Sequence, residues 1–274
     1  MEYRFLTVRE LLLKGMNINM RILFLGTGAA DWEKNPQNFD GVRKFSSALV
    51  NEMLLIDPAP TSYRYFVFLG GDATKITDVI LTHSHADHLD IDDLRAFAKA
   101  SGKKLRFWCD EKVYKKLEAL KDEVEIHEMP MFEKIQVGDF TVTSVPANHL
   151  VDDTDETARH YVIEKGGKTL FYGCDGGWLV TKTWEYIRNL HFDCAVFDCT
   201  CGDYEDDWRL GSHNSIPMLR MIVKTMRTHG ILKDTSKAVA SHLAKTLHTG
   251  IKETENLLKR DDIIAAHDGL ELEF

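Results

Sequence analysis

The sequence predicts an α/β fold in which two β-sheets pack together with helices on their outer faces. Short apolar runs that are typical of buried strands recur through both halves of the 274-residue chain, and helical patterns are inserted between them. No linker, low-complexity tract or short-period repeat divides the chain. We therefore expect one large domain over residues 20–274, preceded by an N-terminal extension over residues 1–19.

Strands dominate the first half of this domain. The first run ends in Gly-Thr-Gly, as a buried strand that enters a tight turn does, and the next two flank the two-residue turn Asn51-Glu52. A helix over Leu89–Ala100 carries apolar residues at helical spacing, and Gly102 is its expected C-cap. The predicted strands are Met20–Gly26, Ser46–Val50, Met53–Asp57, Ile76–Thr82 and Lys104–Trp108.

The second half repeats the alternation of strands and helices. One helix begins at Asn214 or Ser215, has Pro217 in its first turn and ends at Gly230, and a second helical stretch covers Lys252–Arg260. The predicted strands are Phe140–Pro146, Tyr161–Glu164, Thr169–Gly173, Phe192–Cys199, Lys237–Ser241 and Ile263–Ala266.

The composition is that of a soluble globular protein. Hydrophobic residues make up 44% and charged residues 28% of the chain, and 34 Lys and Arg against 43 Asp and Glu give a net charge of −9. No run of 18 apolar residues exists, and charges interrupt the first 20 residues, so we expect a cytoplasmic protein without a membrane span. None of the five cysteines forms a C-x-x-C pair, which makes a disulfide scaffold improbable.

The densest cluster of candidate ligands is Thr82-His-Ser-His-Ala-Asp-His88, directly after an apolar strand. Buried imidazoles without partners would cost free energy, and protonated imidazoles so close together would repel; a divalent cation resolves both problems. His83 and His85 are two residues apart, so in an extended chain they face the same side and can bind one ion. Asp87 and His88 point elsewhere and suit a second ion.

A two-metal site needs more ligands than one loop supplies. Three further candidates, His149, Asp175 and His267, each follow a predicted strand, where a side chain emerges at the rim of a sheet. Asp175 has glycine neighbours, which leave room around its carboxylate.

These residues together carry a family resemblance. From about Met20 to Phe274 the chain resembles the metallo-β-lactamase superfamily in the pattern His83-x-His85-x-Asp87-His88, in His149, Asp175 and His267, and in the earlier Asp57. The resemblance implies an αββα sandwich of two mixed sheets, with two divalent ions at one edge. It implies that His83, His85 and His149 hold one ion, that Asp87, His88 and His267 hold the other, and that Asp175 bridges them. Asp57 would orient a ligand or the bridging water.

Three segments resemble a narrower branch of that superfamily. Arg21–Ala30, Ser46–Leu49 and Ala265–Leu270 look like the cyclic-phosphate phosphodiesterases of phosphonate breakdown and, more distantly, the tRNA 3′-processing endonucleases. His242 resembles a histidine with which those enzymes bind the phosphate or protonate the leaving oxygen. The chain departs from the phosphonate-pathway pattern at residues 31–38, which contain no cysteine.

We therefore expect a binuclear metal-dependent hydrolase, foremost a phosphodiesterase that cleaves a small phosphodiester or cyclic phosphate through a metal-bridging hydroxide. Asp57, Asp87 and His242 are the expected catalytic residues, and Zn²⁺ or Mn²⁺, with Fe²⁺ also compatible, the expected metal. The alternatives are a lactone or thioester hydrolase on the same site and, less favoured, a nuclease. The negative net charge disfavours a large nucleic acid and favours a small anionic ester. A homodimer is left open.

Two weaker signals complete the sequence analysis. Gly26-Thr-Gly28 lacks the third glycine of a dinucleotide fingerprint and is interpreted as a turn near the site. His213 follows an acidic, Trp-containing stretch and precedes a helix, so a role in a substrate-gating loop and a role as a polar helix-entry residue are both open.

Overall fold

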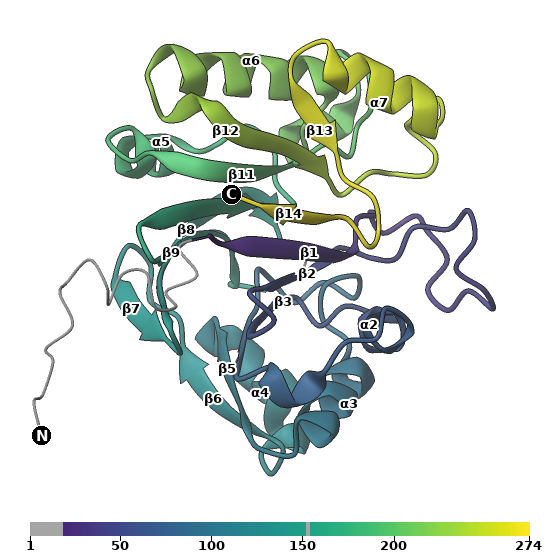
Figure 1. Ribbon diagram of the computed structural model, residues 1–274, viewed down its shortest axis with the longest axis vertical. Coiled ribbons are helices and arrows are strands. Elements are labelled where there is room, and N and C mark those ends of the chain that lie inside the picture. The colour runs from purple at the N-terminus through teal and green to yellow at the C-terminus, as the bar shows by residue number, and fades with distance from the viewer. Residues whose placement is uncertain (1–18, 152–153) are drawn as a thin grey trace, which may run out of the picture.

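A computed structural model of the chain describes residues 19–151 and 154–274 (Figure 1). The predicted extension lies outside the described residues except for Asn19. Two seven-stranded sheets pack face to face, and helices cover their outer faces. This confirms the predicted α/β sandwich. No helix in residues 19–151 and 154–274 has the length and apolar character needed to cross a lipid bilayer.

The first sheet has the strand order β14-β1-β2-β3-β4-β5-β6. Its strands are β1 (Arg21–Gly26), β2 (Ser47–Val50), β3 (Leu54–Ile56), β4 (Asp78–Ile80), β5 (Leu105–Cys109), β6 (Val124–Glu128) and β14 (Glu271–Glu273). Strands β3 to β6 run parallel, whereas β14, β1, β2 and β3 pair antiparallel. The last strand of the chain therefore lies beside the first.

The second sheet has the strand order β13-β12-β11-β10-β9-β8-β7. Its strands are β7 (Lys134–Val137), β8 (Phe140–Leu150), β9 (Thr157–Lys165), β10 (Lys168–Gly173), β11 (Phe192–Asp198), β12 (Leu232–Ser241) and β13 (Ile263–Ala265). Strands β10 to β13 run parallel, and β7 to β10 pair antiparallel.

Three hydrophobic clusters build the four layers. The central cluster joins the facing sides of the two sheets, for example Phe24 and Ile56 with Tyr161 and Val196. The outer face of the first sheet packs on α2 (Ser62–Phe68), α3 (Ile91–Ser101) and α4 (Tyr114–Leu117), and that of the second on α5 (Thr181–Ile187), α6 (Ile216–Thr228) and α7 (Ile251–Lys259). Inner parallel strands such as β3, β4 and β11 are therefore covered on both faces and are buried along nearly their whole length, whereas the edge strand β6 is partly exposed.

The helix boundaries follow from local chemistry. The Asp90 side chain accepts hydrogen bonds from the first amides of α3, and Gly102 ends that helix with φ of 69°. Ser215 is the N-cap residue of α6, and Pro217 lies in its first turn. Short elements such as α2, α4 and β14 escaped the sequence analysis because three to seven residues carry too little periodicity.

One strand differs from its prediction in a way that matters for the site. Strand β8 runs to Leu150 rather than ending at Pro146, so His149 lies within a strand and not after it. The register with β9 shifts between Pro146 and Leu150. Such an irregularity re-aims side chains, and here it accompanies the approach of His149 to the other ligands.

Candidate metal centre

The first group of candidate ligands forms around the loop that follows β4. The Nε2 atom of His83 lies 2.9 Å from Nδ1 of His85, which lies 3.1 Å from Nε2 of His149. Together with Asp175, these residues offer ligand atoms that all lie within 4.8 Å of one another. Burial, aided by the neighbouring His88, lowers the pKa of His83 well below its ordinary value. The ring is therefore neutral, which is the form that binds a metal.

The second group shares Asp175 and adds Asp87, His88 and His242, all of them buried. The Nε2 atom of His88 lies 3.2 Å from Oδ2 of Asp175 and 3.3 Å from Nε2 of His242. Burial opposes the ionisation of Asp87, but His88 and His242 outweigh burial and lower the pKa of Asp87 to about 2. The structure thus brings six of the seven predicted ligands together, and Asp175 belongs to both groups, as a bridging ligand must.

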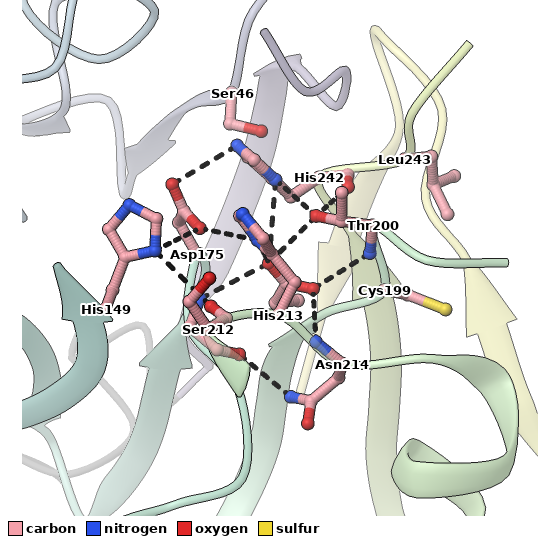
Figure 2. A network of polar contacts seen from close by, with 12 residues as sticks. Ser46, His149, Asp175, Cys199, Thr200, Ser212, His213, Asn214, His242 and Leu243 are labelled. Atoms are coloured by element: carbon pink, nitrogen blue, oxygen red, sulfur yellow. Dashed lines mark hydrogen bonds and ion pairs between the residues drawn. The ribbon is translucent and has the colours of Figure 1, made fainter. Parts of the chain in front are cut away.

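Asp175 lies two residues after the end of β10, and it belongs to both groups. Figure 2 shows His149, His213 and His242 gathered around it. Burial disfavours its charge, but the surrounding imidazoles hold its pKa well below the ordinary value. Its φ is 59°, and that of His242 is 57°, in the left-handed region that residues other than glycine rarely adopt. Backbone strain of this kind is concentrated at functional sites.

The prediction for His267 needs correction. Its side chain is exposed, its Nδ1 lies 3.1 Å from the carbonyl oxygen of Asp268, and it belongs to neither group. The neighbouring Asp268 takes the inward position, where it accepts hydrogen bonds from Thr27 Oγ1 at 2.7 Å and the Lys44 amide at 2.8 Å. Adjacent side chains in this turn face opposite ways, so His267 faces solvent.

His242 occupies the place that was predicted for His267. It directly follows β12, and its Nδ1 lies 2.7 Å from Oγ1 of Thr200. This contact directs Nε2 toward Asp87 and Asp175, each 3.5 Å away. The structure therefore places His242 among the candidate ligands, whereas the sequence analysis expected it to assist the leaving group.

Asp57 lies behind the ligands rather than on the cavity. It is fully buried and accepts hydrogen bonds from the Thr82 amide at 2.7 Å and Thr82 Oγ1 at 2.8 Å. Its Oδ2 also lies 2.9 Å from Nδ1 of His88. This contact holds the proton on Nδ1 and leaves Nε2 as the ligand atom. Asp57 therefore does not line the cavity and lies where it can orient the ring of His88.

The sequence analysis did not assign the pair formed by His213 and Asp198. The Nδ1 atom of His213 lies 2.9 Å from Oδ2 of Asp198 and 3.1 Å from Oδ1 of Asp175. Burial disfavours the charged ring, but the two carboxylates outweigh burial and raise the pKa of His213 to about 11. One signal existed: Asp198 ends an apolar strand just as the other candidate ligands follow theirs.

An open cavity of about 430 Å³ adjoins both groups. The lining residues that bear on the chemistry are His85, Asp87, His149, Asp175, Arg209, His213 and His242. The other residues along its wall include the turn Ala29–Asp31 and the residues Ala244, Thr246 and Leu247. A small molecule can therefore reach the candidate ligands directly from solvent.

The donor set fits divalent metal ions. Both groups combine imidazole nitrogens with carboxylate oxygens and contain no thiolate, which suits Zn²⁺, Mn²⁺ or Fe²⁺. Nδ1 of His85 faces Nε2 of both His83 and His149 at about 3 Å, and its single proton or lone pair can form a hydrogen bond with only one of them, so the arrangement is costly without an ion. A third group, formed by Asp175, Asp198, His213 and His242, overlaps the second.

The sequence match agrees with this geometry. The family model described as "Beta-lactamase superfamily domain" matches residues 52–244, a range that includes every residue of the two groups of candidate ligands. The chain belongs to this superfamily. Its fold is the metallo-β-lactamase fold, and the two groups of residues that could bind metal include His83, His85, Asp87 and His88 of the sequence pattern. A search of curated proteins finds no match.

Solved structures of the same superfamily fold match over almost the whole chain. The metallo-β-lactamase fold protein YhfI from Bacillus subtilis has a TM-score of 0.71 and 20% identity, covering 93% of this chain and 100% of that one. A diphosphatase from the PhnP family has a TM-score of 0.70 and 22% identity, covering 93% and 97%. The short form of human tRNase Z has a TM-score of 0.65 and 15% identity, covering 92% and 98%. At these identities the matches establish the fold.

Proposed function

We propose that the protein is a metal-dependent phosphodiesterase that holds two divalent ions and cleaves a small phosphodiester or cyclic phosphate. The observation that carries the proposal is the sharing of one buried carboxylate, Asp175, between two groups of ligands that face the same cavity. The matching structures include a diphosphatase from the PhnP family and a tRNase Z, whose names denote enzymes that act on substrates containing phosphate groups, which supports this choice.

The candidate ligands would bind two ions, with Asp175 shared between them. His83, His85 and His149 would hold the first ion, Asp87, His88 and His242 the second, and Asp175 both. When bound, such ions activate water and neutralise charge on the phosphate. Asp57 and Thr200 orient His88 and His242 through their Nδ1 atoms, so that each Nε2 faces the ligand group.

His213 is the residue that we propose to protonate the leaving oxygen. It lines the cavity, and both of its carboxylate contacts use Nδ1, so Nε2 is the atom available to substrate. The fully buried Asp198 keeps the ring charged and fixes its orientation. A charged imidazole at this place can donate a proton to an alkoxide as it leaves.

Metal analysis and a hydrolysis assay test the proposal together. The wild-type protein, loaded with Zn²⁺ or Mn²⁺, should hold two ions per chain and hydrolyse bis(p-nitrophenyl) phosphate. Asp87→Ala should reduce both the metal content and the activity. Less than one ion per chain in the wild type, or activity that survives Asp87→Ala unchanged, would contradict the proposal.

The matched pair His242→Ala and His267→Ala tests the ligand assignment. His242 lies in the second group and His267 is exposed outside it, so only the first substitution should remove an ion and the activity. The opposite result would restore the assignment made from sequence. Assays of lactones and thioesters under the same conditions test the two alternative hydrolase activities. Faster turnover of either class than of phosphodiesters would replace the phosphodiesterase proposal.

A further inference from the structure

Arg209 is the only Lys or Arg among the described residues along the wall of the site cavity. It lies in the short helical turn Trp208–Gly211. The main-chain oxygen of Arg209 accepts the amide of His213 at 2.9 Å. The backbone of this one turn therefore holds Arg209 in a fixed relation to the residue that we place beside the leaving group.

The guanidinium of Arg209 is oriented but only partly engaged. Its Nε donates to Oδ1 of Asp207 at 2.9 Å, and the same oxygen accepts the Arg209 amide at 2.8 Å. Among the described residues, no protein acceptor binds either Nη group of this side chain. Its carbon Cζ lies 5.7 Å from the ring centroid of Trp208, which is 84% exposed. The two Nη groups, with four N–H donors, thus remain for a ligand.

The acidic groups of the cavity do not compete for this cation. Asp87 and Asp175 belong to the metal-ligand groups. Asp31 accepts hydrogen bonds from the amides of Lys245 and Thr246 and from Thr246 Oγ1, all within 2.8 Å. Among the described residues that line the cavity, Arg209 is therefore the Lys or Arg side chain with donors open to an anion from solvent, and it belongs to neither group of candidate ligands.

We propose that Arg209 binds a second anionic group of the substrate, a phosphate or a carboxylate separate from the diester that is cleaved. The inference rests on the proposed phosphodiesterase function and narrows its substrate class to small diesters that carry at least two negative charges. An arginine fork fits both kinds of anion because each presents two oxygens in one plane.

Three esters with the same leaving group test Arg209. Thymidine 5′-(p-nitrophenyl phosphate) lacks a second anion, its 3′-phosphate derivative has one, and its 3′-hemisuccinate derivative has a carboxylate instead. With metal-loaded wild type, we expect a KM about 10-fold lower for one or both derivatives than for the parent ester. Arg209→Gln should raise that KM to the parent value and leave kcat nearly unchanged. Whichever derivative shows the larger effect identifies the anion.

Calorimetry supplies a readout that does not depend on turnover. Metal-loaded wild type should bind thymidine 3′,5′-bisphosphate about 10-fold more tightly than thymidine 5′-monophosphate, and Arg209→Gln should remove the difference. Arg220→Gln is the matched control. Arg220 also binds an aspartate through Nε, Asp261 at 2.7 Å, but it lies on α6 away from the site cavity. This variant should behave as wild type.

The possible failures are distinguishable. Hydrolysis of all three esters with equal KM values, or equal losses in Arg209→Gln and Arg220→Gln, would overturn the role of Arg209 and leave the phosphodiesterase proposal standing. Hydrolysis of none of the esters would overturn the proposed function and the inference with it.

Discussion

The Nδ1 atom of His213 lies 2.9 Å from Oδ2 of Asp198, whose carboxylate has no exposure to solvent. The same carboxylate accepts hydrogen bonds from the Thr200 and Asn214 amides at 2.8 and 3.0 Å. Two backbone amides thus fix Asp198, which fixes His213 in turn. A buried carboxylate with this set of donors can hold an imidazolium in one orientation.

This pair predicts a rate loss that depends on the leaving group. His213→Ala should lower kcat about 100-fold or more for a dialkyl phosphodiester, because an alkoxide needs a proton to leave. It should have a much smaller effect on p-nitrophenyl esters, since p-nitrophenolate leaves without one. Steady-state rates with both substrates measure the difference, and metal analysis should still find two ions. Equal losses with both leaving groups would exclude proton donation by His213.

Asp198→Asn should weaken the same step. The neutral amide can still accept the backbone hydrogen bonds through one oxygen, but it no longer holds charge on His213. The variant should therefore show the leaving-group dependence of His213→Ala at a smaller magnitude, with the folded state retained by circular dichroism. Wild-type rates for the dialkyl ester in Asp198→Asn would argue against this positioning role.

Substitution of Asp57 should weaken metal binding, although Asp57 is not itself a candidate ligand. Asp57→Asn removes the acceptor that holds the proton on Nδ1 of His88, so Nε2 is no longer set as the ligand atom. We expect the affinity for the second ion to fall about 10- to 100-fold. Competition with a chromophoric chelator measures this affinity, and the affinity for the ion at His83, His85 and His149 should change less. An unaltered second affinity would contradict the assignment.

His160 predicts a pH dependence of stability. It is fully buried, neither ring nitrogen has a hydrogen-bond partner among the described residues, and burial lowers its pKa to about 4. Between pH 6.5 and 4 the unfolded chain takes up a proton that the folded chain does not. The free energy of unfolding should therefore decrease as the pH decreases from 6.5 to 4, and His160 should account for about 3 kcal/mol of this decrease.

The matched variants are His160→Leu and His267→Leu. The first should flatten the dependence of urea unfolding on pH between 4 and 6.5, because leucine fills the site without titrating. The second replaces an exposed histidine and should leave the dependence as in wild type. An unchanged slope in His160→Leu would place the acid sensitivity elsewhere.

Substitution of Asp268 should cause a large loss of stability, whereas substitution of the neighbouring His267 should not change the stability. Lys44 is buried, and its Nζ lies 3.4 Å from Oδ2 of Asp268. Asp268→Ala leaves this cation without its carboxylate and Thr27 without an acceptor, which should cost about 3 kcal/mol in the free energy of unfolding. Urea denaturation measures it, and His267→Ala in the same assay should lie close to wild type.

Local sequence was sufficient for much of the fold and part of the site. An apolar strand followed by His83, His85, Asp87 and His88 places four candidate ligands in six residues, and their spacing alone predicts the two groups in which the structure places them. The alternation of strands and helices also indicated two sheets. The predicted strand before Asp175 indicated its place in the site, because the carboxyl ends of parallel strands bring polar groups to one edge of a sheet. These features depend on neighbours in the chain.

Tertiary structure decided which distant residue completed the site. His242 and His267 both follow strands that end in apolar or small residues, and their local sequence does not show which of them faces the site. The choice depends on contacts across the fold: Thr200 turns His242 inward, while Thr27 and Lys44 draw Asp268 inward and leave His267 in solvent. The pairing of His213 with Asp198 arises in the same way. Spacing along the chain determines which side chains lie at the end of a strand. Packing between elements determines which of them face the candidate metal centre.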